Sequence, residues 1–352
     1  MSPDSHLFEL GAAVVKTAIL IGAVLTAVAY LTYTERRVSA LIQDRLGPNR
    51  VGPFGLLQPL ADGIKFIFKE DTVPSGANKI IYSLAPAFSF VTALAALAVI
   101  PIGRGFETDL MGLLPAPVFI SFQIADIDAG ALYVFAVSSL SVYGVILGGW
   151  ASNSKYSLIG GIRGISQMIS YELALGLSVI GVFVLVGSLR INDIVEYQSG
   201  VWLMFSQFFG FIIFLIASFA ETNRLPFDVP EAEPEIVGGY HTEYSGMKFA
   251  MFFMAEYTHM IVASCLITAL YLGGWYPLPF FGWGGIDIET HWYLPPIVFL
   301  GKVAAMLFFF IWVRWTLPRF RSDQIMAFGW KVLLPLSVAN IFGTAVYVAL
   351  KG

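Results

Sequence analysis

Eight long runs of apolar residues constrain the fold of this chain more than any other feature. A helix that crosses a membrane needs about 20 apolar residues in a row. The runs cover approximately 10–33, 80–102, 129–150, 165–187, 202–220, 248–273, 296–316 and 326–349. Only 12% of the residues are charged, whereas soluble proteins contain about 25%. The sequence therefore predicts an all-α polytopic membrane protein with about eight transmembrane helices, organised as a single domain over residues 1–352.

The distribution of arginine and lysine orients these helices, because the cytoplasmic loops of membrane proteins carry an excess of positive charge. One set of loops holds Arg36, Arg37, Arg45, Arg50, Lys65, Lys69, Lys79, Lys155, Arg163, Arg224, Arg319 and Arg321. The other set holds only Arg104 and Arg190, with Lys351 at the tail. An even number of spans places both termini on one side, which is predicted to be the outer, periplasmic side. The loops 34–79 and 221–247 are then cytoplasmic.

The first cytoplasmic loop, 34–79, contains an amphipathic segment at 56–70. Leu60, Ile64 and Ile67 share one helical face, while Asp62 and Lys65 lie on the other. The segment is too short to span, so we predict a helix in the plane of the membrane interface. Such a helix is either a spacer on the membrane surface or part of a site that uses Asp62.

The stretch 221–247 interrupts the apolar sequence with six acidic residues and a single arginine, Arg224. Prolines recur at positions 226, 230 and 234, and this spacing predicts an extended or turning path rather than a helix. In an extended strand Glu231, Glu233 and Glu235 point the same way, so at least one of them is expected to have a raised pKa. A solvated acidic loop is the alternative interpretation.

Carboxylates also occur in or at the ends of the predicted spans. Glu172 lies inside the fourth span, Glu221 ends the fifth, Glu256 lies inside the sixth and Glu35 follows the first. A carboxylate in a membrane is costly, and chains of such groups carry protons, so these residues are candidates for a proton path. A paired structural role remains open for Glu172. His259 shares the face of Glu256, and we interpret it as a packing residue.

Cationic residues are predicted at the same level of the membrane as these acids. They are Arg36, Arg37, Arg45, Arg314 and Arg319. This polarity suits a cavity that opens from the cytoplasmic face.

Several kinds of cofactor are excluded by composition. The single Cys265 rules out a disulfide framework and an iron–sulfur cluster held by this chain, which needs about four thiolates. The sequence has no nucleotide-binding motif and no metal-ligand spacing. Only His259 lies at membrane depth, whereas a bis-histidine haem needs two facing histidines. Redox groups must therefore be supplied by partners.

Motifs throughout the chain resemble a known family, the H subunit of bacterial respiratory complex I, which is equivalent to mitochondrially encoded subunit 1. They are ETNRLPFD at 221–228, GYHTEYSGM at 239–247, RLGPNRVGPFGLLQPLADGIK at 45–65, ISYE at 169–172, FMAEY at 253–257 and PRFRSDQ at 318–324. Pro234 and the outer loops at 103–128 and 274–295 depart from the familiar pattern. The resemblance implies a membrane subunit of proton-pumping NADH:quinone oxidoreductase in the bacterial inner membrane.

The resemblance also implies roles for particular residues. Expected to line a quinone chamber are Glu35, Arg36, Arg45, Asp62, Phe227, Glu231, Glu233, Glu235, Arg314 and Arg319. Expected in a proton path toward the antiporter-like subunits are Glu172, Glu221, Glu243 and Glu256. The substrate would be ubiquinone or menaquinone, with no cofactor bound by this chain alone.

The implied partners are the hydrophilic quinone-site subunits of the peripheral arm, small membrane subunits, antiporter-like subunits and membrane lipid, and no nucleic acid. Iron–sulfur clusters, FMN and NADH would belong to those other subunits. Two alternatives stay open. One is the homologous membrane subunit of a hydrogenase-type complex. The other is a stand-alone proton-coupled transporter, which predicts internal repeats with interrupted helices.

Overall fold

The computed structural model describes residues 3–108, 118–277, 279, 283 and 291–351, and of these the side chains of 3–10, 107, 108, 118, 233 and 234 are not described. The long helices are α1 (Pro3–Ile42), α3 (Lys79–Ala96), α4 (Gly130–Ala151), α5 (Lys155–Val186), α10 (Gly246–Leu270), α11 (Leu294–Thr316) and α13 (Leu334–Lys351). Within the described residues, seven helical stretches are long and apolar enough to cross a membrane, and α8 (Phe208–Glu221) is a shorter apolar helix. The predicted all-α polytopic fold is confirmed.

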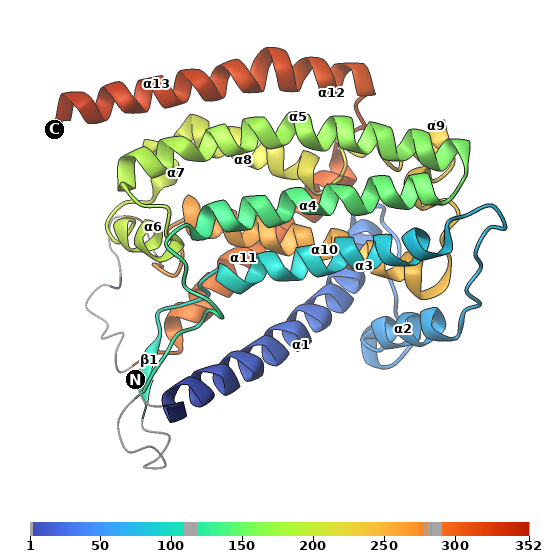
Figure 1. Ribbon diagram of the computed structural model, residues 1–352, viewed down its shortest axis with the longest axis horizontal. Coiled ribbons are helices and arrows are strands. Elements are labelled where there is room, and N and C mark those ends of the chain that lie inside the picture. Colours follow the sequence, from blue (N-terminus) through green and yellow to red (C-terminus); the bar gives the residue numbers. More distant parts are fainter. Residues whose placement is uncertain (1–2, 109–117, 278, 280–282, 284–290, 352) are drawn as a thin grey trace.

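The long helices run side by side, with both chain ends at the same end of the molecule (Figure 1). α12 (Ser322–Phe328) continues through the π-helical segment Gly329–Leu333 into α13, along the top edge of the view. α1 crosses obliquely below the other helices. α2 (Gln58–Phe68) packs against α1 and α10 at the end opposite the termini. The predicted amphipathic helix is thus confirmed, within the bounds 58–68.

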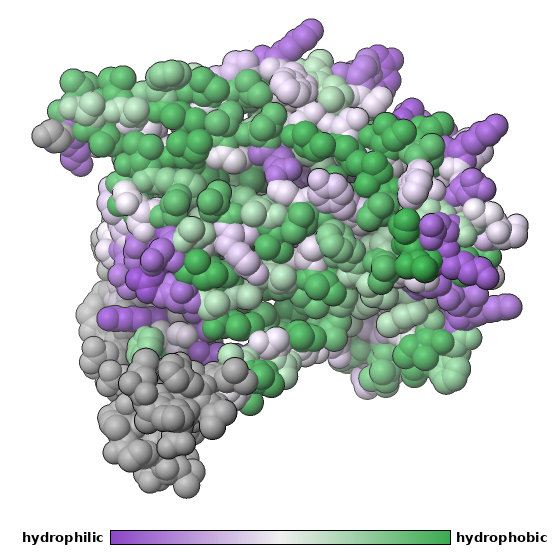
Figure 2. Space-filling view, viewed as in Figure 1, coloured by the Kyte–Doolittle hydropathy of each residue, from purple (hydrophilic) through white to green (hydrophobic). Residues whose placement is uncertain are grey.

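The surface reflects this arrangement. Figure 2 shows apolar residues over the flanks of the helices, whereas hydrophilic residues gather at the right-hand end, near α2, and around α6 (Ile191–Tyr197). A helix bundle with an apolar middle and polar ends matches the thickness and polarity of a bilayer.

The end that carries the termini also has a small strand pair that the sequence did not predict. β1 (Phe106–Thr108) pairs antiparallel with β2 (Val118–Ile120), with Phe106 opposite Ile120.

α1 is longer than predicted. The expected span ended at residue 33, but the helix continues to Ile42, so Glu35 and Arg36 lie within it. No glycine or proline occurs between Gly22 and Gly47, so nothing in the sequence stops the helix earlier. The consequence is that Glu35 is held on a rigid element that faces the other helices.

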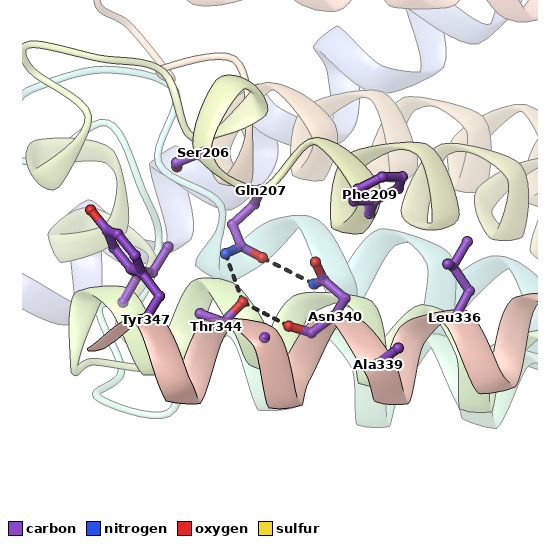
Figure 3. Close-up of a pocket in the computed structure, with 10 residues that line it drawn as sticks. Ser206, Gln207, Phe209, Leu336, Ala339, Asn340, Thr344 and Tyr347 are labelled. Carbon is purple, nitrogen blue, oxygen red and sulfur yellow. Dashed lines mark hydrogen bonds between the residues drawn. The ribbon is translucent and has the colours of Figure 1, made fainter. Parts of the chain in front are cut away.

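The fifth predicted span is broken at Gln207, which separates α7 (Leu203–Ser206) from α8. The side chain of Gln207 donates to Thr344 Oγ1 at 2.9 Å and accepts from Asn340 Nδ2 at 3.0 Å, both on α13 (Figure 3). These bonds lie beside a groove of about 610 Å³ that includes Leu336 and Tyr347. The polar contact fastens α13 to the bundle, because polar groups in an apolar medium need partners.

The acidic stretch 221–247 lies directly against α5. A Cβ at Gly160 would lie 2.6 Å from the backbone nitrogen of Tyr240, so only glycine permits this approach. Gly239 has a φ of +61°, and a Cβ there would meet the carbonyl oxygen of Pro230 at 1.8 Å. The stretch is therefore folded onto the bundle rather than extended into solvent.

Candidate functional site

A cavity of about 440 Å³ lies between α1, α2, α10 and α11. We call it the α1–α2 cavity. Its volume falls in the range of about 300–1,000 Å³ that is typical of sites for small organic ligands. Along α1 the lining changes from Leu25 and Val28 to Glu35 and Arg36 within about two helical turns. The cavity thus has an apolar part and a charged part, which suits a ligand with a long apolar chain and a polar head.

Glu35 lies at the centre of the charged part. Its carboxylate accepts a hydrogen bond from Tyr257 Oη at 2.7 Å and pairs with Arg224 Nη1 at 3.0 Å and with Arg314. The four residues come from α1, α10, α11 and the loop after α8. A carboxylate with three donors can be buried in its ionised form, because every partner compensates for lost water.

Arg224 connects Glu35 to a second acid, Glu256. Its Nε lies 2.7 Å from Glu256 Oε1, although the N–H is not aligned for a hydrogen bond. The guanidinium also lies 4.3 Å above the ring of Tyr257. Only 2% of the Arg224 side chain is exposed, so this is a fully buried cation between two carboxylates. One end of the network lines the α1–α2 cavity and the other end lies among the membrane acids.

A separate ion pair closes the side of the α1–α2 cavity next to α2. Asp62 Oδ2 lies 2.7 Å from Arg36 Nη1, and Lys65 Nζ lies 3.3 Å from Asp62 Oδ1. Partial burial would by itself raise the pKa of Asp62, but Arg36 and Lys65 hold that pKa below its ordinary value. The pair fixes the interfacial helix to α1, and both Asp62 and Arg36 line the cavity.

The acidic stretch contains two further pairs. Asp228 Oδ2 lies 2.5 Å from Arg319 Nη2, and His241 Nε2 lies 3.2 Å from Glu231 Oε1. Burial, together with the charge of Glu231, raises the pKa of Asp228 to about 7, although Arg319 opposes the shift. Burial alone would raise the pKa of Glu231, but His241 and nearby arginines lower it. Neighbouring acids in one loop therefore hold protons to different extents.

The predicted extended path of this stretch is wrong. A short helical turn, α9 (Glu233–Ile236), has Pro234 near its start, where a proline fits because the missing N–H would be unpaired anyway. A second turn follows at Gly239–His241. Glu231 is 16% exposed and contacts His241, whereas Glu235 is 46% exposed and lies 2.5 Å from Arg163 of α5. The two acids do not share one environment, and the side chain of Glu233 lies outside the described residues.

The membrane acids form a second group. Glu221 and Glu256 both line a small cavity of about 30 Å³, which we call the inner cavity. Glu172 of α5 is within electrostatic reach of Glu221 and accepts a hydrogen bond from Ser139 of α4. Three of the four predicted proton-path residues are thus brought into one region.

The remaining predicted residues lie elsewhere. Arg45 is on an exposed turn after α1 and is not among the described residues that line the α1–α2 cavity. Phe227 is buried between Tyr171 and Phe320 and lines a different, apolar cavity of about 560 Å³. Glu243 contributes its backbone carbonyl to Tyr82 Oη at 2.7 Å.

Sequence reasoning missed three residues of the charged network. Arg224, Tyr257 and His241 were not selected, although each contacts a selected acid. Arg224 left a signal in the sequence, because it is the single cation among six acids and directly follows an apolar helix. Tyr257 and His241 left none, since their partners are known only from the fold.

The described residues offer no metal centre. Among them, no group of three or more His, Cys, Asp or Glu side chains is placed to hold an ion. Cys265 is buried as a free thiol. The chemistry available to the site is therefore binding, charge compensation and proton transfer.

Comparisons with known proteins agree with this geometry. The family model for NADH dehydrogenase matches residues 15–345. The chain is 50% identical to H subunit 2 of NADH-quinone oxidoreductase from Koribacter versatilis, over 96% of this chain and 97% of that protein. It is 52% identical to H subunit 2 of NADH-quinone oxidoreductase from Geobacter sulfurreducens, over 94% of both chains. With matches that run almost from end to end, the chain belongs to the NADH dehydrogenase family of membrane subunits, alongside the H subunits of NADH-quinone oxidoreductase.

Proposed function

We propose that this protein is the membrane subunit that admits quinone into an NADH:quinone oxidoreductase and couples quinone reduction to proton translocation. The observation that carries the proposal is the buried Glu35–Arg224–Glu256 network, which joins the α1–α2 cavity to the membrane acids. A ligand cavity and a set of buried carboxylates in contact through one arginine are what such coupling requires.

The α1–α2 cavity suits a quinone. Phe66 of α2 and Phe249 and Phe253 of α10 contribute apolar lining that fits an isoprenoid chain. Glu35 and Arg314 mark the polar part, toward the end of the bundle where α2 lies. Quinone would be ubiquinone or menaquinone. Electrons would arrive from iron–sulfur clusters in partner subunits, with FMN and NADH further away, since the donor set of the described residues supports no metal redox centre.

Coupling follows from charge. Reduction adds negative charge at the quinone head, and Arg224 and Arg314 are the buried cations nearest the cavity that can respond. If Arg224 turns toward that charge, its attraction for Glu256 weakens, and Glu256 then favours taking up a proton. The acidic loop can shift with it at Gly238 and Gly239, beside Glu231 and Asp228. The proton would pass through Glu221 and Glu172.

The position of the chain in the membrane follows from the same proposal. It is a multi-pass inner-membrane protein, with the end that carries α2 and the acidic stretch on the cytoplasmic side and both termini periplasmic. The cytoplasmic end would contact the hydrophilic quinone-site subunits of the peripheral arm. Small membrane subunits and antiporter-like subunits would pack on the exposed apolar helices, together with lipid.

The test is Glu172→Gln in the assembled complex, reconstituted in liposomes. The variant is expected to keep reducing quinone and to translocate fewer protons per quinone, because the amide cannot exchange a proton. Glu196→Gln is the matched control, since Glu196 is exposed on α6 near the other end of the bundle. Proton translocation that stays normal per quinone reduced in Glu172→Gln contradicts the path.

A further inference from the structure

The inner cavity contains polar groups that the path above does not use. The Nε2 atom of His259 and the Oγ atom of Ser89 are buried and have no hydrogen-bond partner among the described residues. They come from facing helices, α10 and α3, and both residues line the cavity together with Glu221 and Glu256. Buried polar atoms in proteins are almost always hydrogen-bonded, so two orphans on one cavity point to a shared partner.

The size of the cavity identifies that partner. A volume of about 30 Å³ is close to the space that one water molecule occupies in the liquid. Water also needs two to four polar neighbours, and this cavity offers four from three helices: His259 and Glu256 from α10, Ser89 from α3 and Glu221 from α8. A water here bonds to His259 Nε2 and Ser89 Oγ and reaches the two carboxyl groups.

We propose that His259 is a proton relay between Glu256 and Glu221, acting through water in the inner cavity. A proton leaves the Glu256 carboxyl group, passes through water to His259 Nε2, and moves on through water to the Glu221 carboxylate. Each transfer breaks one O–H or N–H bond and forms another, and no electron moves. The proposal rests on the proposed proton path and adds to it a residue that the carboxylates alone do not supply.

Other ionisable groups around the cavity affect this relay. Tyr240 lines the cavity, Arg224 lies against Glu256, and Glu172 acts on Glu221 from α5. The described lining from α3 and α4 is neutral and includes Ser89 and Ser141. Among the described residues that line the inner cavity, the relay group is thus the single imidazole, bounded by carboxylates, a phenol and one arginine.

The experiment compares His259→Asn and His259→Leu with the unchanged protein in the reconstituted complex across pH. Asparagine keeps a hydrogen-bonding group but cannot change its charge. Both variants are expected to slow coupled turnover by about tenfold or more and to remove the imidazole titration from its pH profile. Ser264→Ala is the matched control, because this buried serine of α10 bonds to its own helix and lies outside the lining of the inner cavity.

Two further variants make the result decisive. Ser89→Ala removes the other orphan group and is expected to slow coupled turnover in the same direction, which keeps the proposal testable if the His259 variants do not assemble. Glu256→Gln tests the path itself. If Glu256→Gln stops proton translocation while the His259 and Ser89 variants keep the normal rate and pH profile, the relay is overturned and the path stands. If Glu256→Gln also translocates normally, the proposed path has failed.

Discussion

Replacing Arg224 by methionine tests the charged network most sharply. The side chains of Arg224, Glu35 and Glu256 are 2%, 6% and 10% exposed, so solvent screens none of these charges effectively. Removing one partner of a buried ion pair typically costs about 3–5 kcal/mol, because the other charge stays buried without compensation. Glu35 keeps Arg314 and Tyr257, so the cost falls mainly on Glu256. We expect a loss of about 3–5 kcal/mol, rather than twice that amount.

The assay is denaturant titration of the purified complex, with release of this subunit as the signal. Arg224→Met combined with Glu256→Gln should recover part of the loss, with a coupling free energy of about 1–3 kcal/mol. Arg190→Met is the control, because its pair with Asp126 is exposed and worth about 1 kcal/mol or less. Strictly additive effects of the two substitutions, or an Arg224→Met loss no larger than that of the control, would refute the reasoning.

Three other expectations concern the α1–α2 cavity and the acidic loop. Asp62→Asn removes the pair with the half-exposed Arg36, worth about 1 kcal/mol, and should raise the KM for quinone about fivefold with little change in kcat; an unchanged KM would contradict this. Ala29→Phe narrows the cavity from α1 and should reduce quinone reduction at least about tenfold while NADH oxidation by a water-soluble acceptor is kept, and equal loss in Ala12→Phe, on the same helix, would count against it. Asp228 has a pKa raised to about 7, above about 3.9 in the unfolded chain, so the folded protein binds the extra proton and its stability should fall as pH rises from about 4 to 7. Asp228→Asn should remove that dependence, and equal slopes of thermal midpoint against pH in both proteins would contradict it.

The sequence was sufficient to predict the class of fold and most of the acids. Runs of about 20 apolar residues and the cost of a charge in a membrane are local properties, so they identified the spans and singled out Glu172 and Glu256. The amphipathic period likewise identified α2 and Asp62. These features depend only on residues near one another in the chain.

Pairing could not be predicted in the same way. Arg224 and Glu35 are 189 residues apart in the sequence, and their contact depends on how α1 packs against α10. Phe227 was placed in the quinone chamber by resemblance, but its ring packs between Tyr171 and Phe320. The proline spacing suggested an extended chain, whereas Pro234 begins a helical turn. In each case the tertiary contact decides between options that the local sequence leaves equal.

Photoaffinity labelling of the assembled complex tests the central claim most directly. An azido-quinone with a long isoprenoid chain would be activated by light in the absence and presence of excess natural quinone, and the labelled residues mapped by mass spectrometry. The account predicts labels that natural quinone competes away on the lining of the α1–α2 cavity, around Thr32, Phe66, Met247 and Phe253. Competed labels confined to the apolar cavity beside Phe227, with none on α1, α2 or α10, would contradict it.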